Sequence, residues 1–135
     1  MEVTFCRCLV FLGCLLLGAG EPPFLRPALR LLATGDVLPN PTVYGMDQDA
    51  QGRLWVGTQD GVAVFNGQRW QPFPLPTGAV STFIRTVLCA HDGSQWFGTQ
   101  DGGLWRLHKG QWTHFKGGAE LPSNRIYSLC ETFDA

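Results

Sequence analysis

The sequence predicts an all-β chain built from repeated units of four short antiparallel strands. Residues 52–65, GRLWVGTQDGVAVF, return as GSQWFGTQDGGLWRL at residues 93–107. Apolar and polar residues alternate with a period of two in both copies, which is typical of strands. Asp-Gly and Asn-Gly pairs separate the alternating runs, and such pairs favour tight hairpin turns. These features exclude a helical repeat.

The copies follow one another at a nearly constant spacing. Trp55 and Trp96 are 41 residues apart, and LPNPTVYGM at residues 38–46 returns as LPSNRIYSL at residues 121–129. A fixed period near 42 residues, with four strands in each repeat, is typical of a β-propeller blade.

Each repeat divides into four predicted strands, and Pro72 fits the end of an outer strand because proline cannot donate to a ladder. The third repeat is expected to contribute only its first strand. The predicted strands are 42–47, 53–58, 62–65 and 69–73 in the first repeat, and 83–90, 95–99, 104–108 and 111–115 in the second.

We expect five segments along the chain of 135 residues. A propeller closes with about four to eight blades, so we expect an incomplete propeller, either the beginning of a longer protein or the product of a truncated gene. The segments are a signal peptide at 1–20, an extended lead-in at 21–37, a first blade at 38–80, a second blade at 81–120, and the start of a third at 121–135.

The first twenty residues have a composition of their own. One arginine, Arg7, precedes an apolar run from Cys8 to Leu17, and small residues follow at 18–20. This layout predicts a secretory signal helix with cleavage after Gly20. The run is too short to span a bilayer, which takes about 20 residues. The alternative is a buried or interfacial helix.

Composition excludes several classes of function. The net charge is −1 and the basic residues are scattered, so no basic patch for nucleic acid is expected. Three of the five cysteines lie in the signal peptide. Cys89 and Cys130 occupy equivalent positions and are expected to be buried free thiols. The three histidines match no zinc-binding spacing, and no metal or cofactor is predicted.

Residues 43–62, VYGMDQDAQGRLWVGTQDGV, resemble the two-component regulator propeller repeat at essentially every motif position. The second copy departs from it, because Ala90 replaces the motif aspartate and Gly103 is inserted before Leu104. We expect Asp92 to take over the first turn. The motif positions expected to shape the blades are Asp49, Gly52, Trp55, Gly57, Thr58 and Gly61, then Gly93, Trp96, Gly98, Thr99 and Gly102.

The resemblance implies a bacterial membrane sensor. In this family an extracytoplasmic propeller precedes a small β-sandwich, one transmembrane helix and a cytoplasmic histidine kinase or diguanylate cyclase. It implies a small-molecule or glycan ligand, a periplasmic location, membrane attachment only through a downstream region, and a receptor dimer. The output module would lie beyond these residues, so the chain itself is expected not to be an enzyme.

Three equivalent positions are candidate ligand contacts. Tyr44, Arg85 and Tyr127 directly follow the first-strand aliphatic residue in successive repeats. We expect them to lie toward one face, with packing between blades as the alternative. Trp105 has no counterpart in the first repeat and is a further candidate, with core packing as its alternative.

Two other functions fit a propeller. One is a lyase or lactonase, which would hold a metal through His, Glu or Asp on the inner strands. The other is a purely structural interaction propeller. The predicted inner strands carry aliphatic residues such as Val43, Ile84 and Ile126 at their inward positions. The sensor interpretation is therefore favoured.

Overall fold

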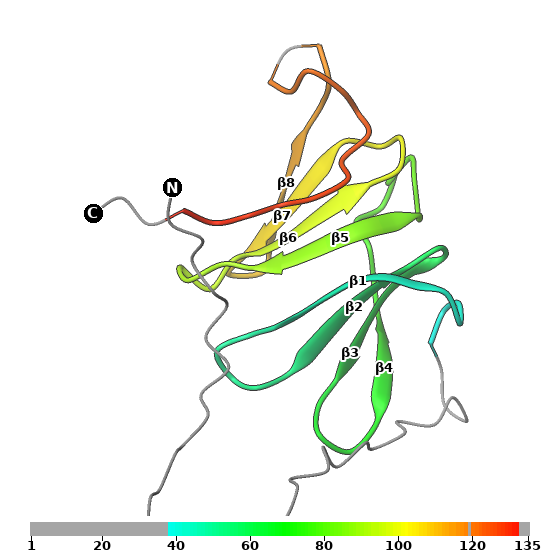
Figure 1. Ribbon diagram of the computed structural model, residues 1–135, viewed down its shortest axis with the longest axis vertical. Coiled ribbons are helices and arrows are strands. Elements are labelled where there is room, and N and C mark those ends of the chain that lie inside the picture. Colours follow the sequence, from blue (N-terminus) through cyan, green and yellow to red (C-terminus); the bar gives the residue numbers. More distant parts are fainter. Residues whose placement is uncertain (1–37, 119, 133–135) are drawn as a thin grey trace, which may run out of the picture. The chain divides into compact units, whose positions relative to one another are not determined.

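The protein is described here by a computed structural model that places residues 38–118 and 120–132. Within these residues eight strands form two four-stranded antiparallel sheets, and no helix is present. The all-β prediction is confirmed, and the two sheets are consistent with propeller blades (Figure 1). The predicted signal helix and lead-in lie outside the described residues.

The order of strands in each sheet follows the sequence, as it does in a chain of hairpins. The predicted strands agree with the observed ones within a few residues at each end. The first sheet consists of β1 (Val43–Gln48), β2 (Leu54–Thr58), β3 (Gly61–Phe65) and β4 (Trp70–Phe73), and the second of β5 (Ile84–Cys89), β6 (Gln95–Thr99), β7 (Leu104–His108) and β8 (Gln111–Phe115).

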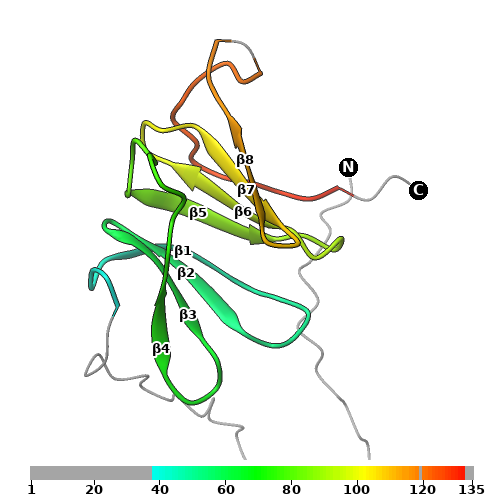
Figure 2. The same ribbon diagram turned by 180° about the vertical axis from the view of Figure 1, so that it is seen from behind.

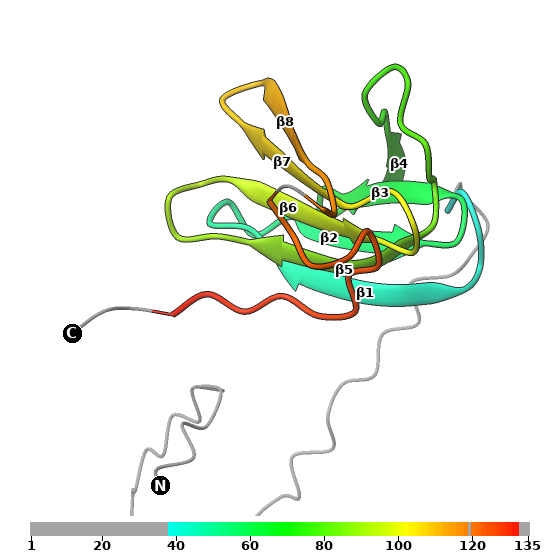
Figure 3. The ribbon, with the colours of Figure 1, turned by 90° about the horizontal axis from the view of Figure 1, so that it is seen from above.

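The two sheets approach each other most closely at their first strands. A Cβ atom on Gly45 of β1 would lie 2.8 Å from the Cα atom of Thr86 in β5, so only glycine fits there. Figure 3 shows β1 and β5 side by side, whereas the outer strands β4 and β8 diverge (Figures 2 and 3). First strands that converge and fourth strands that diverge are what blades around a common axis require.

The hydrophobic core lies between the two sheets. Trp55 of β2 is 1% exposed, and its ring centroid lies 5.9 Å from that of Phe97 in β6. Ile84 and Phe97 are fully buried in the same cluster. Trp55 therefore fills the space between the sheets, where a large apolar side chain contributes most.

The stretch after β8 differs from the strand expected at the start of a third blade. Residues 122–132 form no strand, although the Ile126 backbone N–H donates to the Thr99 carbonyl at 2.9 Å. In both sheets the first strand pairs with the second strand of its own sheet. Among the described residues this stretch has no such partner, so its backbone is extended without a ladder.

Candidate functional site

The first strand of each sheet carries a β-bulge at a candidate ligand position. In β1 the register with β2 shifts between Val43 and Gly45, and in β5 the register with β6 shifts between Ile84 and Thr86. Tyr44 and Arg85 are the residues left without a ladder partner. A bulge bends its strand and redirects a side chain. Both side chains are thereby removed from the regular alternation of the strand.

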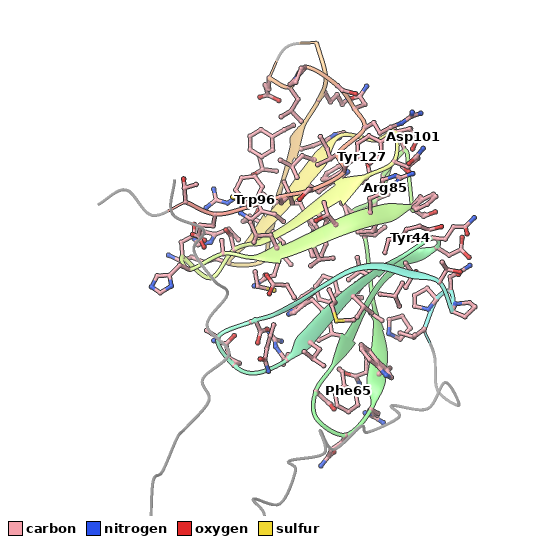
Figure 4. All side chains as sticks on the ribbon, in the orientation of Figure 1. Tyr44, Phe65, Arg85, Trp96, Asp101 and Tyr127 are labelled. Carbon is pink, nitrogen blue, oxygen red and sulfur yellow. The ribbon has the colours of Figure 1, made fainter. Side chains whose placement is uncertain are left out.

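The bulged residues belong to one continuous row of contacts. The rings of Tyr44 and Phe83 are 4.6 Å apart between centroids. The guanidinium carbon of Arg85 lies 5.3 Å from the Phe83 ring and 4.7 Å from the Tyr127 ring. Figure 4 shows Tyr44, Arg85 and Tyr127 along the same side of the molecule. We call Tyr44, Phe83, Arg85 and Tyr127 the rim row.

The rim row is accessible to solvent. Tyr44 is 44% exposed and Tyr127 is 62% exposed, which is unusual for large rings in a folded protein. Neither phenolic hydroxyl hydrogen-bonds to another described residue. The row therefore offers aromatic surface and hydroxyl groups to a molecule outside the chain.

Gln100, in the turn between β6 and β7, anchors the middle of the rim row. Its backbone N–H donates to the Phe83 carbonyl at 3.0 Å, and its side-chain oxygen accepts from Nε of Arg85. Its carbonyl accepts from Nε of Arg125 at 3.2 Å. An open cavity of about 320 Å³ lies beside it, lined by Gln100, Asp101, Ser123, Asn124 and Arg125.

Asp49 fixes the turn that leads from β1 into β2. Its carboxylate accepts from the backbone N–H groups of Gln51 and Arg53, from Nε of Arg53 at 2.7 Å, and from the Trp55 indole at 2.8 Å. Burial alone would raise the pKa of Asp49. The hydrogen bonds from Trp55 and Arg53 outweigh burial and hold that pKa below its ordinary value. The motif aspartate thus couples the turn to the core tryptophan.

The second sheet builds the same turn from different residues. Ser94 is fully buried; its hydroxyl donates to Asp92 and accepts from the Trp96 indole at 2.9 Å. Hydrogen bonds from the Ser94 side chain and backbone lower the pKa of Asp92 to about 2, and Arg106 adds to this effect. Asp92 and Ser94 together therefore do what Asp49 does in the first sheet.

The motif glycine after the tryptophan leaves room for the next repeat. A Cβ atom on Gly57 would lie 2.6 Å from Cγ2 of Ile84, and one on Gly98 would lie 2.7 Å from Cγ2 of Ile126. Ile84 and Ile126, which precede Arg85 and Tyr127, therefore each pack on a glycine of the preceding sheet.

The motif threonine closes the turn between the second and third strands. The hydroxyl of Thr58 donates to the Gly61 carbonyl at 2.9 Å, and that of Thr99 donates to the Gly103 carbonyl at 2.8 Å. In the second sheet it is thus Gly103, with φ of 80°, that corresponds to Gly61. Gly102 instead donates its N–H to the Thr99 hydroxyl.

Residues 37–60 match the family model described as two component regulator propeller. The matched range contains the first two strands of the first sheet, β1 and β2. The matched residues include Asp49, Trp55 and Gly57, whose contacts explain why the motif needs them. No curated protein matches the chain significantly.

Trp96 and Trp105 of the second sheet pack against other residues of the chain. Trp96 stacks on Phe115 at 5.6 Å with Arg106 over its ring, and it lines a cavity of about 360 Å³. Trp105 stacks on His114 at 3.8 Å and packs against the core cluster. Its indole N–H is buried without a partner among the described residues. Trp105 is therefore separate from the rim row.

Cys89 and Cys130 are free thiols in different environments. Cys89 is half-buried, and burial raises its pKa to about 12, with Asp47 and Asp49 adding to the effect. Its backbone N–H donates to Asp47 at 2.8 Å. Cys130 is exposed, which corrects the expectation that both thiols are buried.

Two features are absent from the part of the chain that the structure describes. No group of His, Cys, Asp or Glu side chains in it could hold a metal ion. No helix long and apolar enough to cross a membrane occurs among the same residues.

Sequence reasoning singled out three members of the rim row and missed Phe83, Gln100 and Arg125. Phe83 and Arg125 occupy equivalent positions, directly before the aliphatic residues Ile84 and Ile126. The repeat spacing could therefore have pointed to both. The part played by Gln100 depends on contacts across the β6–β7 turn, which spacing along the chain does not reveal.

Proposed function

We propose that these blades belong to the ligand-sensing propeller of a two-component-type signal transduction receptor. The observation that carries the proposal is the pair of β-bulges that turns Tyr44 and Arg85 into one rim row with Tyr127. The match of residues 37–60 to the family supports it.

The rim row suits a ligand that contains a ring, such as a glycan fragment or another small molecule. Aromatic faces bind flat apolar surfaces, and phenolic hydroxyls can donate to or accept from ring substituents. Both tyrosines are exposed, so a ligand reaches them without displacing the core. The proposal assigns no catalytic step to these residues.

The cellular setting is part of the same proposal. The signal-peptide pattern of residues 1–20 supports an exported propeller on the periplasmic face. A downstream transmembrane segment would attach the parent receptor to the inner membrane as a dimer. A histidine kinase or diguanylate cyclase would then respond to the ligand.

The proposal is tested by calorimetric titration of the full chain with a panel of neutral oligosaccharides. We expect a saturable interaction that weakens about tenfold in Tyr127→Ala and in Tyr44→Ala, because each change removes one stacking surface. Phe65→Ala is the matched control, since Phe65 lies far from the rim row (Figure 4). Equal affinity in all the variants would place the ligand elsewhere and overturn the assignment.

A further inference from the structure

Among the described residues, the guanidinium groups of Arg85 and Arg125, beside Gln100, each make a hydrogen bond through Nε alone. Arg85 and Arg125 each use Nε to reach Gln100. Neither guanidinium makes a hydrogen bond through its Nη atoms to any residue within 38–118 or 120–132. Neither forms an ion pair with the carboxylates of those same residues. Each guanidinium therefore keeps a pair of N–H donors for another molecule.

The stacking of Arg85 also leaves these donors accessible. A planar guanidinium contacts aromatic rings with its face and hydrogen-bond acceptors with its edge. The Phe83 and Tyr127 rings lie 5.3 and 4.7 Å from the guanidinium carbon, so they restrict the rotation of the Arg85 side chain. A group that is already held in place loses little conformational entropy when a ligand binds.

The neighbouring cavity supplies a further donor. Asn124 lines it together with Arg125, and its side-chain oxygen accepts from the Gly117 N–H at 2.7 Å. The side-chain NH₂ of Asn124 has no partner among the described residues. Asp101 lines the same cavity and carries the opposite charge, so it weakens anion binding there.

We propose that Arg85 and Arg125, positioned by Gln100, form an anion subsite at the end of the rim row. The subsite takes a group with two or more charged oxygens, either a carboxylate or a phosphate, which matches the paired donors of a guanidinium. It rests on the proposed function and deepens it, because it gives the ligand an anionic group beside its ring.

The test is a titration of the full chain with sodium acetate and, separately, with inorganic phosphate. Ionic strength is held constant by exchange against chloride, since screening alone would otherwise change the spectra. Binding is followed by NMR through the Gln100 amide and the Nε–H signals of Arg85 and Arg125. We expect saturable shifts of these signals with at least one anion, and the arm that saturates identifies the group.

Four variants separate the subsite from general attraction of anions. Arg85→Gln and Arg125→Gln are each expected to weaken binding about tenfold, because each removes charged hydrogen bonds. Arg125→Lys keeps the charge and loses the paired donors, so it should also weaken binding. Arg69→Gln removes the same charge from the β3–β4 turn and should leave the affinity unchanged. Each variant is compared only where its amide spectrum remains that of the folded protein.

Asp101→Asn should act in the opposite direction and strengthen binding, because it removes a repelling carboxylate from the cavity. The proposal is overturned if the shifts stay linear with both anions, or if Arg69→Gln weakens binding as much as Arg125→Gln. It is also overturned if Asp101→Asn weakens binding. If the chain binds oligosaccharides but neither anion, the subsite is rejected and the proposed function stands. If it binds an anion but no oligosaccharide, the proposed function is rejected and the anion subsite stands.

Discussion

At the scale of single residues, Asp49 shows how one carboxylate can hold a turn and a core side chain together. Its four hydrogen bonds come from Gln51, from Arg53 twice and from Trp55. Gln51 and Arg53 belong to the turn and Trp55 belongs to β2. Loss of this carboxylate therefore weakens both the turn and the packing of the core tryptophan. The first sheet is therefore sensitive to a residue of the turn between β1 and β2.

Asp49→Ala should lower the free energy of unfolding by about 3 kcal/mol, because it leaves the buried Trp55 indole and two backbone N–H groups without their acceptor. Asp49→Asn keeps one acceptor oxygen and should cost less. Urea denaturation at neutral pH measures both changes. Asp60→Ala, in an exposed turn, is the control and should change stability by under about 1 kcal/mol.

The same carboxylate predicts a pH dependence. The pKa of Asp49 is lower in the folded chain than its ordinary value. The ionised carboxylate therefore stabilises the fold fully at any pH above the ordinary pKa. The effect is lost as the pH falls through the lowered pKa. The difference in stability between the wild type and Asp49→Asn should therefore shrink below about pH 4. A constant difference down to pH 2 would mean that the charge of Asp49 contributes nothing.

At the scale of the strand, the glycine of β2 and the isoleucine of β5 form one contact between sheets. Gly57→Ala should cost about 1–3 kcal/mol, since the new methyl group would overlap Ile84. The double variant Gly57→Ala/Ile84→Ala should lose less unfolding free energy than the sum of the losses in the two single variants. A double-mutant cycle in urea measures this coupling, and strict additivity would show that the two positions do not touch.

The equivalent pair is Gly98 of β6 and Ile126 in the stretch after β8, and it should respond differently. A Cβ atom on Gly98 would meet Thr86 at 2.5 Å as well as Ile126. Ile126→Ala should therefore relieve only part of the cost of Gly98→Ala. A second double-mutant cycle, on Gly98 and Ile126, measures this difference. Comparing it with the Gly57 and Ile84 cycle shows how much of the cost at Gly98 comes from Thr86 of the same sheet.

At the scale of the whole molecule, the two sheets share one hydrophobic cluster. Trp55 and Val62 come from the first sheet, and Ile84 and Phe97 come from the second. Because neither sheet buries these side chains alone, the described residues should unfold as one cooperative unit. Native-state hydrogen exchange should give β2 and β6 the same opening free energy, and Ile84→Ala should lower both together. Separate values that respond independently would contradict this.

The fold could be predicted from sequence because its determinants are local. The pairs Asp60-Gly61 and Asn66-Gly67 specify hairpins between neighbouring strands, and no long-range pairing had to be guessed. The rim row could be predicted in part, since equivalent positions such as Tyr44 and Tyr127 repeat at a fixed spacing. The hydrogen bonds of Ser94 with Asp92 and Trp96 could not be predicted, and neither could the contacts of Gln100 with the two arginines. Both sets of contacts depend on where a turn places a side chain in space.

The bulge in the first strand has a consequence for how such a repeat can change over evolution. Since Tyr44 and Arg85 have no residue directly opposite them on the neighbouring strand, a change of side chain there disturbs no cross-strand side-chain pair. The neighbouring Val43 and Ile84 keep the pairing. A lineage could thus exchange the chemistry of its rim one repeat at a time while the scaffold stays the same. The same separation makes positions 44 and 85 the natural ones to randomise in a library of engineered binders.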